Sequence, residues 1–118
     1  MIQIKHKKSG EVLREVGAET LEGVDLRGAR LGGALLANTS LRGARLNGAD
    51  LSSADLSCCD LRGADLRGAQ VQNADLRATD LRGANLRGTD LRLASLRFIR
   101  YDRHTRWPLF FNPKKERI

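Results

Sequence analysis

Leucine recurs every five residues through the middle of the chain. On an α-helix, five residues turn by about 500°, so successive leucines would spread around the whole surface. On an extended strand, an odd spacing would send successive leucines to opposite faces. Neither element would form an apolar face. The fifteen units follow one another without an insertion, with leucine replaced once by Val71, and the leucines are Leu26, Leu31, Leu36, Leu41, Leu46, Leu51, Leu56, Leu61, Leu66, Leu76, Leu81, Leu86, Leu91 and Leu96.

The period predicts a coil that turns one corner per unit, so that each leucine points inward from its own short extended side. The residue two before leucine is Ala in ten units and Val, Thr or Cys in the others, which places a second, small side chain on the inner face. The flanking positions, most often Asp before and Arg after, then point outward. Gly stands two after leucine in eight units, where a corner needs backbone angles that other residues resist. Corners of about 90° close a four-sided coil of about twenty residues, with coils stacked at about 4.8 Å.

The units ADLRG, ANLRG and ADLSS resemble the consensus of the pentapeptide-repeat proteins, and the resemblance covers residues 24–98. It implies an all-β fold, a right-handed quadrilateral β-helix with four units per coil, and the repeats would form nearly four coils. The segment YDRHTRWPLFFNP is similar to the aromatic tail that closes many bacterial members. The segment MIQIKHKKSGEVLREV is similar to short leader segments found before such repeats.

We therefore expect an N-terminal cap in residues 1–23, a solenoid in 24–98 and a capping tail in 99–118, because the open ends of a solenoid need cover. IQIK and EVLREV are β-rich runs separated by a turn at Ser9-Gly10, which predicts a hairpin. The last 21 residues hold every aromatic side chain, and these predict a lid over the last coil, with a docking or dimer surface as the alternative. The aromatic residues are Phe98, Tyr101, Trp107, Phe110 and Phe111.

The net charge of +7 divides as 0, +3 and +4 over the three parts of the chain. Residues twenty apart should stack, and exposed Arg–Asp pairs along such ladders are worth about 0 to 1 kcal/mol each. We expect one basic interaction face and one C-terminal basic, aromatic patch. The face comprises Arg42, Arg62, Arg82, Arg67 and Arg87, and the patch comprises Arg100, Tyr101, Arg103, Arg106, Trp107, Lys114, Lys115 and Arg117.

The sequence predicts no catalytic, metal-binding or cofactor-binding residues. His6 and His104 lie in the flanks without a nucleophile nearby in sequence, and no glycine-rich phosphate loop opens a helix. Cys59 falls at a small inward position, so we expect a buried, inert thiol, and Cys58 falls at a corner. Two neighbouring cysteines cannot cross-link distant parts of a fold.

These features favour a non-enzymatic scaffold or protein-interaction module whose partner is a protein with an acidic surface. Weak nucleic-acid binding through the C-terminal patch is the alternative, and a third possibility is a module usually fused to an enzyme or receptor. The resemblance also suggests gyrase protection by DNA mimicry, which we do not expect because the rod is basic. A monomer or an end-to-end homodimer is expected. The chain has no apolar run of signal-peptide or membrane-span length, so we expect a cytoplasmic protein that does not bind membranes.

Overall fold

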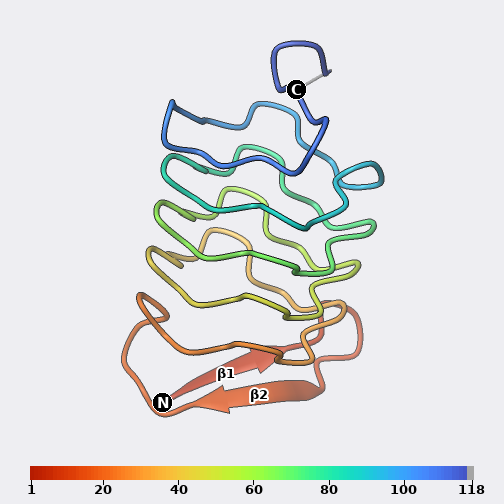
Figure 1. Ribbon diagram of the computed structural model, residues 1–118. Helices are drawn as coiled ribbons and strands as arrows, with labels where there is room; N and C mark the ends of the chain where they lie inside the picture. Colours follow the sequence, from red (N-terminus) through yellow and green to blue (C-terminus); the bar gives the residue numbers. More distant parts are fainter. Residues whose placement is uncertain (117–118) are drawn as a thin grey trace.

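The computed structural model describes residues 1–116 and is all-β, without a helix in that range. Two strands, β1 (Ile2–Lys5) and β2 (Val12–Val16), form an antiparallel hairpin from the two runs expected to do so. The chain then winds upward in stacked coils (Figure 1). The molecule measures 39 × 25 × 22 Å. Within the described part, no helix has the length and apolar character needed to cross a membrane.

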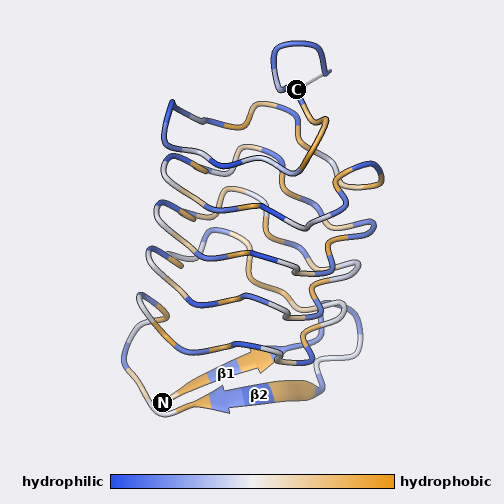
Figure 2. Ribbon diagram, in the orientation of Figure 1, coloured by the Kyte–Doolittle hydropathy of each residue, from blue (hydrophilic) through white to orange (hydrophobic). Residues whose placement is uncertain are grey.

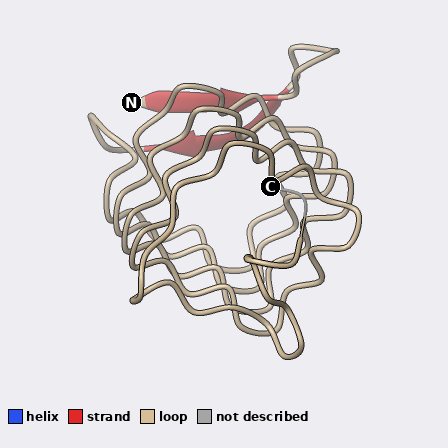
Figure 3. Ribbon diagram, turned by 90° about the horizontal axis from the view of Figure 1, so that it is seen from above, coloured by secondary structure: helices blue, strands red, loops and turns tan. Residues whose placement is uncertain are grey.

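The coils are joined by parallel backbone pairing between residues twenty apart. Asp25 pairs with Arg45, Asp60 with Asp80 and Asp75 with Ser95. The hydrogen bonds repeat in the same register: the Leu46 N–H donates to the Asp65 carbonyl at 2.8 Å. Twenty residues make four five-residue units, and the view along the axis shows a four-sided outline (Figure 3).

We number the sides by their residues. Side 1 holds residues 19–23, 39–43, 59–63, 79–83 and 99–103, and each later side follows five residues further along the chain. Side 2 thus begins at residues 24–28, side 3 at 29–33 and side 4 at 34–38. In the last coil, side 2 is displaced by one residue, so that Thr105 and Trp107 take its inward positions. In residues 24–98, the leucine or Val71 at the centre of each side points inward, and its two neighbours point outward.

Each corner is a tight turn whose third residue has a left-handed backbone. The N–H of the next inward Ala bonds back to the leucine carbonyl, as in Ala64 to Leu61 at 3.0 Å. The residue two after leucine has a φ near +60 to +77° at every corner of the repeat except Leu93. Glycine adopts this angle at most corners, and residues of other types adopt it at Asn38, Ser53, Cys58, Ala78 and Phe98.

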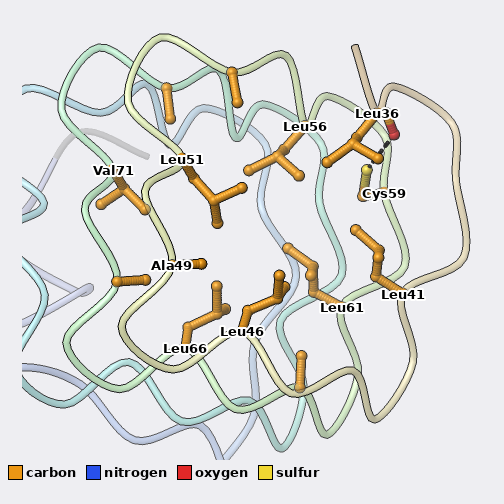
Figure 4. Packing of buried hydrophobic residues seen from close by; sticks show 14 of the residues in the cluster. Leu36, Leu41, Leu46, Ala49, Leu51, Leu56, Cys59, Leu61, Leu66 and Val71 are labelled. Atoms are coloured by element: carbon orange, nitrogen blue, oxygen red, sulfur yellow. Dashed lines mark hydrogen bonds between the residues drawn. The ribbon is translucent and has the colours of Figure 1, made fainter. Parts of the chain in front are cut away.

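The core is a column of leucines with small residues between them (Figure 4). Leu41, Leu51, Leu61 and Leu81 are fully buried, as are Ala44 and Ala54. Hydrophobic and hydrophilic residues accordingly alternate along each coil (Figure 2). Burying each leucine contributes about 1.5 to 3 kcal/mol. Small and large side chains together fill the narrow interior to the density of other protein cores.

The hairpin packs beneath side 4 and continues its stack. Side 4 lies across the coil from side 2. The Leu35 N–H donates to the Lys5 carbonyl at 2.8 Å, and the Lys7 N–H donates to the Gly33 carbonyl at 2.8 Å. A side chain at position 33 would collide with the imidazole ring of His6, so the hairpin packs directly on the Gly33 backbone. Coil contacts begin before residue 24, because Leu21 is buried in the same column as Leu41.

The first half of the tail extends the coil, and Trp107 packs partly buried against the top of the core. Asp80 pairs with Arg100, and Asn85 pairs with Arg106, one residue later than the spacing of twenty predicts. Thr105 occupies the inward position above Ala84, and its hydroxyl donates to the Leu81 carbonyl at 2.8 Å. Residues 109–116 then leave the coil as the dark blue segment at the top of Figure 1.

Candidate interaction surfaces

The outward arginines and aspartates of one unit bind each other. Where Asp precedes leucine and Arg follows it, the guanidinium donates two hydrogen bonds to the carboxylate. In the Arg62–Asp60 pair, Nε lies 2.9 Å from Oδ1 and Nη2 lies 2.7 Å from Oδ2. The same carboxylate accepts the arginine backbone N–H at 3.1 Å. The pairs of this kind are Arg27–Asp25, Arg62–Asp60, Arg67–Asp65, Arg77–Asp75, Arg82–Asp80 and Arg92–Asp90.

These contacts stabilise the charged form of each aspartate. The hydrogen bonds from Arg62 and Arg82 lower the pKa of Asp60 and Asp80 below the usual 3.8, although partial burial opposes the effect. Asp80 also lies 3.7 Å from Arg62 and 3.8 Å from Arg100, so three guanidinium groups surround one carboxylate. From Asp60 to Arg100, side 1 is therefore a charge-paired wall rather than a row of free cations.

The five arginines of the expected basic face lie on two sides that meet at a corner. Arg42, Arg62 and Arg82 stack on side 1, and Arg67 and Arg87 stack on side 2. Arg42 follows Ser40 and Arg87 follows Asn85, so neither has a carboxylate in its own unit. Among residues 1–116, neither makes an ion pair.

The C-terminal patch divides between the last coil and the segment beyond it. Arg100, Arg103 and Arg106 are exposed on sides 1 and 2. The Tyr101 and Trp107 rings meet edge to face at 5.6 Å, and Trp107 stacks on Phe111 at 5.0 Å, so these rings contact one another. Lys114 and Lys115 are exposed in the final turn, whereas Arg117 lies outside the described residues.

An apolar groove opens where side 3 departs from its regular register. The Asn73 N–H bonds to the Leu93 carbonyl instead of the carbonyl of the preceding residue, and this segment bulges outward at the right of Figure 1. The groove has a volume of about 450 Å³ and lies between residues 89–96 and 108–111. Leu109 is 87% exposed and Phe110 is completely exposed beside it.

Two further reactive side chains, Cys59 and His6, are held in structural roles. Cys59 is buried, as predicted; its thiol donates to the Leu36 carbonyl, and burial raises its pKa to about 11 (Figure 4). Nδ1 of His6 accepts the Lys8 N–H at 3.1 Å and the Ser9 N–H at 3.3 Å. No group of three metal-binding side chains occurs in residues 1–116.

The sequence reasoning missed one exposed arginine of side 2, Arg45, and did not place a second, Arg106, on that side; both lie directly before the central inward residue of their unit. The residue at that position is usually Asp, and comparing the residues that stand there twenty apart in the sequence would have revealed Arg45 as an arginine between two aspartates. Arg106 was assigned to the tail patch alone because the extra residue before it hides its alignment with Asn85.

Comparison with known proteins shows which repeats these are. A family model described as pentapeptide repeats matches residues 21–57 and 59–97 with eight copies. No curated protein matches the chain. The similar solved structures include three that are described as pentapeptide-repeat proteins.

HetL from Nostoc sp. PCC 7120 is 40% identical, with a TM-score of 0.65 over 69% of this chain and 38% of HetL. This chain therefore spans less than two-fifths of that relative. Rfr23 from Cyanothece 51142 is 28% identical, with a TM-score of 0.52 over 89% of this chain and 78% of Rfr23. The Nostoc protein alr5209 is 41% identical, covering 77% of this chain and 79% of its own, with a TM-score of 0.40.

Proposed function

The chain belongs to the pentapeptide-repeat family, and from that premise we propose that it is a non-enzymatic interaction module. Its scaffold is a right-handed, four-sided β-helix of nearly four coils, capped by the hairpin and the aromatic tail. Its outer sides bind another protein. HetL, a relative, is described as involved in the regulation of heterocyst differentiation, and regulation of that kind is consistent with binding rather than catalysis.

The observation that carries this proposal is the fixed geometry of the outward charges. Each Asp–Leu–Arg unit holds its guanidinium by two hydrogen bonds, and the carboxylate is itself tied to the backbone. Side chains that are already ordered lose less conformational entropy when a partner binds. Such rigid, flat sides suit recognition of another surface.

The partner that these sides favour is a protein with an acidic surface. Carboxylates match the guanidinium group in a planar, two-bond geometry. Arginine is also enriched at protein interfaces, whereas lysine is depleted there, and every basic residue in the repeats of residues 24–98 is arginine.

The test is affinity capture from the native cell, using the full chain as bait. The variant Arg42→Glu, Arg67→Glu, Arg87→Glu reverses three arginines of the expected basic face, and Arg30→Glu, Arg77→Glu, Arg92→Glu is the control with an equal change of charge. We expect the wild type and the control to retain a protein with an acidic surface that the basic-face variant loses. Identical captured proteins for all three forms would contradict a role for this face.

Nucleic-acid binding through the C-terminal patch is the second candidate. Arg100, Arg103 and Arg106 are exposed together near the end of the coil, which is the observation in its favour. A mobility-shift assay at low and at higher salt tests it, with neutralisation of Lys114, Lys115 and Arg117 as the diagnostic variant. Absence of a shift at both salt concentrations would exclude this role.

End-to-end pairing of two copies is a proposal on the state of assembly. The exposed Leu109 and Phe110 beside the apolar groove support it, because large exposed apolar side chains often mark contact surfaces. Size-exclusion chromatography with light scattering should give a dimer for the wild type and a monomer for Leu109→Ser, Phe110→Ser. A monomeric wild type would contradict the pairing.

A further inference from the structure

The net positive charge of the coil lies on one side only. Sides 1, 3 and 4 each carry equal numbers of arginines and carboxylates: five of each on side 1, and two of each on sides 3 and 4. Side 2 is different because its arginines outnumber its carboxylates by three. Its charged residues are Arg27, Arg45, Arg67, Arg87 and Arg106, with Asp25 and Asp65.

The excess on side 2 is exposed and has no carboxylate of its own. Asp25 and Asp65 are each held by the arginine of the same unit, at 2.8 and 2.6 Å. Arg45 stands between them in the stack, and Arg87 and Arg106 lie further along, beside the neutral Asn85. In the part of the chain that the structure describes, these three arginines make no ion pair, so their guanidinium groups can bind a ligand.

Both edges of side 2 are bare backbone. In residues 19–98, all eight corners that flank it are glycine, whereas Gly33 is the one glycine among the eight corners between sides 3 and 4 and between sides 4 and 1. Gly33 is required by the His6 ring, but a Cβ at the side-2 corners would meet no atom closer than 3.4 Å. The backbone angle favours glycine but does not require it, because other residues adopt the same angle at Ser53 and Ala78. The flanking corners are Gly23, Gly43, Gly63, Gly83, Gly28, Gly48, Gly68 and Gly88.

We propose that side 2 is the docking face for an acidic protein surface, an inference that rests on the interaction role proposed above. The free arginines supply the attraction, and the glycine corners let a flat partner approach along both edges. A second copy of this chain does not fit, because none of its sides has a net negative charge.

A protein fits this face better than a nucleic acid does. Asp25 and Asp65 stand among the arginines and would repel a uniformly charged phosphate backbone, whereas a protein surface can place a cation opposite each of them. The stacking of bases needs aromatic side chains, and side 2 has only Trp107, which is half-buried against Phe111.

The test measures binding of a labelled polyglutamate peptide to the full chain by fluorescence anisotropy, with a single-stranded oligonucleotide of equal charge in parallel. The variant Arg45→Ser, Arg87→Ser, Arg106→Ser removes the side-2 excess. Its control, Arg30→Ser, Arg92→Ser, Arg97→Ser, removes equal charge from sides 3 and 4. We expect the side-2 variant to bind the peptide about tenfold more weakly, and the control to change by less than about twofold. Equal weakening by both would overturn the assignment.

A second pair of variants tests the close approach. The variant Gly63→Asn, Gly68→Asn adds side chains at the corners of side 2. The control Ser53→Asn, Ala78→Asn enlarges the side chains at corners away from side 2. Asparagine tolerates the corner backbone, as Asn38 and Asn73 do. The first variant should weaken peptide binding by about threefold, a change of about 0.6 kcal/mol, and the second should leave it unchanged. No difference between the two would show that the glycine edges play no part.

The outcomes also separate this inference from the broader proposal. Loss of peptide binding only in a variant with Arg42→Ser, Arg62→Ser, Arg82→Ser would keep the interaction role and overturn side 2 as its site. Tighter binding of the oligonucleotide than of the peptide would overturn the acidic protein as partner. Failure of the peptide to bind any form, at low salt, would overturn both.

Discussion

At the scale of single residues, the corner positions decide whether the chain can coil. Each needs a positive φ, which costs a non-glycine residue about 1 to 2 kcal/mol. The chain nevertheless accepts Ser53, Cys58 and Ala78 there, because the buried leucines on either side outweigh that cost. Gly33 has a second constraint, since His6 of the hairpin packs on its backbone.

We predict that Gly33→Ala destabilises the protein more than Gly43→Ala does. Both replacements strain the backbone by about 1 kcal/mol, and only the first also drives a methyl group into the His6 ring, at a further cost of about 1 to 3 kcal/mol. Urea unfolding measures both. In a His6→Ala background the two replacements should cost the same, and a persisting difference would show that His6 is not the obstacle.

We predict that one thiol reacts in the folded protein and two react after unfolding. Cys58 is exposed, whereas Cys59 is 2% exposed and its pKa is raised to about 11 by burial, so little thiolate forms at neutral pH. Titration with a chromogenic disulfide reagent, with and without denaturant, gives the count, and Cys58→Ser should abolish the reaction of the native protein. Two rapidly reacting thiols in the native state would mean that Cys59 is not in the core.

At the scale of elements, the outward ladders and the two ends stabilise the coil in different ways. The ladders contribute many ion pairs, each of which adds a small amount to the stability that the buried leucines provide. The ends must cover the apolar cross-section and satisfy the backbone. Residues 99–107 do so as an added half-coil, in which the Leu81 N–H donates to the Arg100 carbonyl and the Leu86 N–H donates to the Arg106 carbonyl, each at 2.7 Å.

We predict that the free energy of unfolding is level from neutral pH to about pH 4 and falls below it. The pKa of Asp60, Asp65, Asp75 and Asp80 is lowered in the folded state by the adjacent arginine, so their contribution is complete above the ordinary value of 3.8. This contribution is lost as the pH falls through the lowered pKa values. Urea unfolding between pH 2 and pH 6 measures the free energy of unfolding at each pH. In the variant Asp60→Asn, Asp80→Asn this free energy should fall less steeply with pH than in the wild type, and the same slope in both proteins would contradict this account.

We predict that residues 100–118 contain a part that the fold requires and a part that it does not. Removing 109–118 keeps every ladder bond of the last coil, so the protein should stay folded with a modest loss of stability. Removing 100–118 exposes the top of the leucine column and should abolish cooperative unfolding. Circular dichroism and urea titration compare the two forms. Full stability without residues 100–118 would favour the docking role alone.

At the scale of the whole molecule, the sequence predicts the coil well because its period is strict. Five-residue spacing identifies the inward leucines, the small inward residues and the corners, and it places Cys59 in the core. Two irregularities could not be predicted. The coil departs from its register near Leu93, and it gains one residue before Arg106, because a local bulge leaves no mark on a periodic pattern.

The candidate surfaces were predicted less completely, because charge was counted along the chain rather than around the coil. Stacking at intervals of twenty identified the ladder of Arg42, Arg62 and Arg82. It did not separate Arg67 and Arg87, which lie on the next side. Counting by side places the whole excess of the coil on side 2, and this distribution is the central claim about the molecule.

Nuclear magnetic resonance of the arginine side chains tests that claim most directly. The Nε–Hε signals of the full chain are followed while the polyglutamate peptide is added at low salt. The signals of Arg45, Arg87 and Arg106 should shift in proportion to saturation, together with the backbone signals of Gly43, Gly48, Gly63 and Gly68. The signals of Arg30, Arg77 and Arg97 should stay in place. Equal shifts on all four sides, or shifts confined to side 1, would contradict the account.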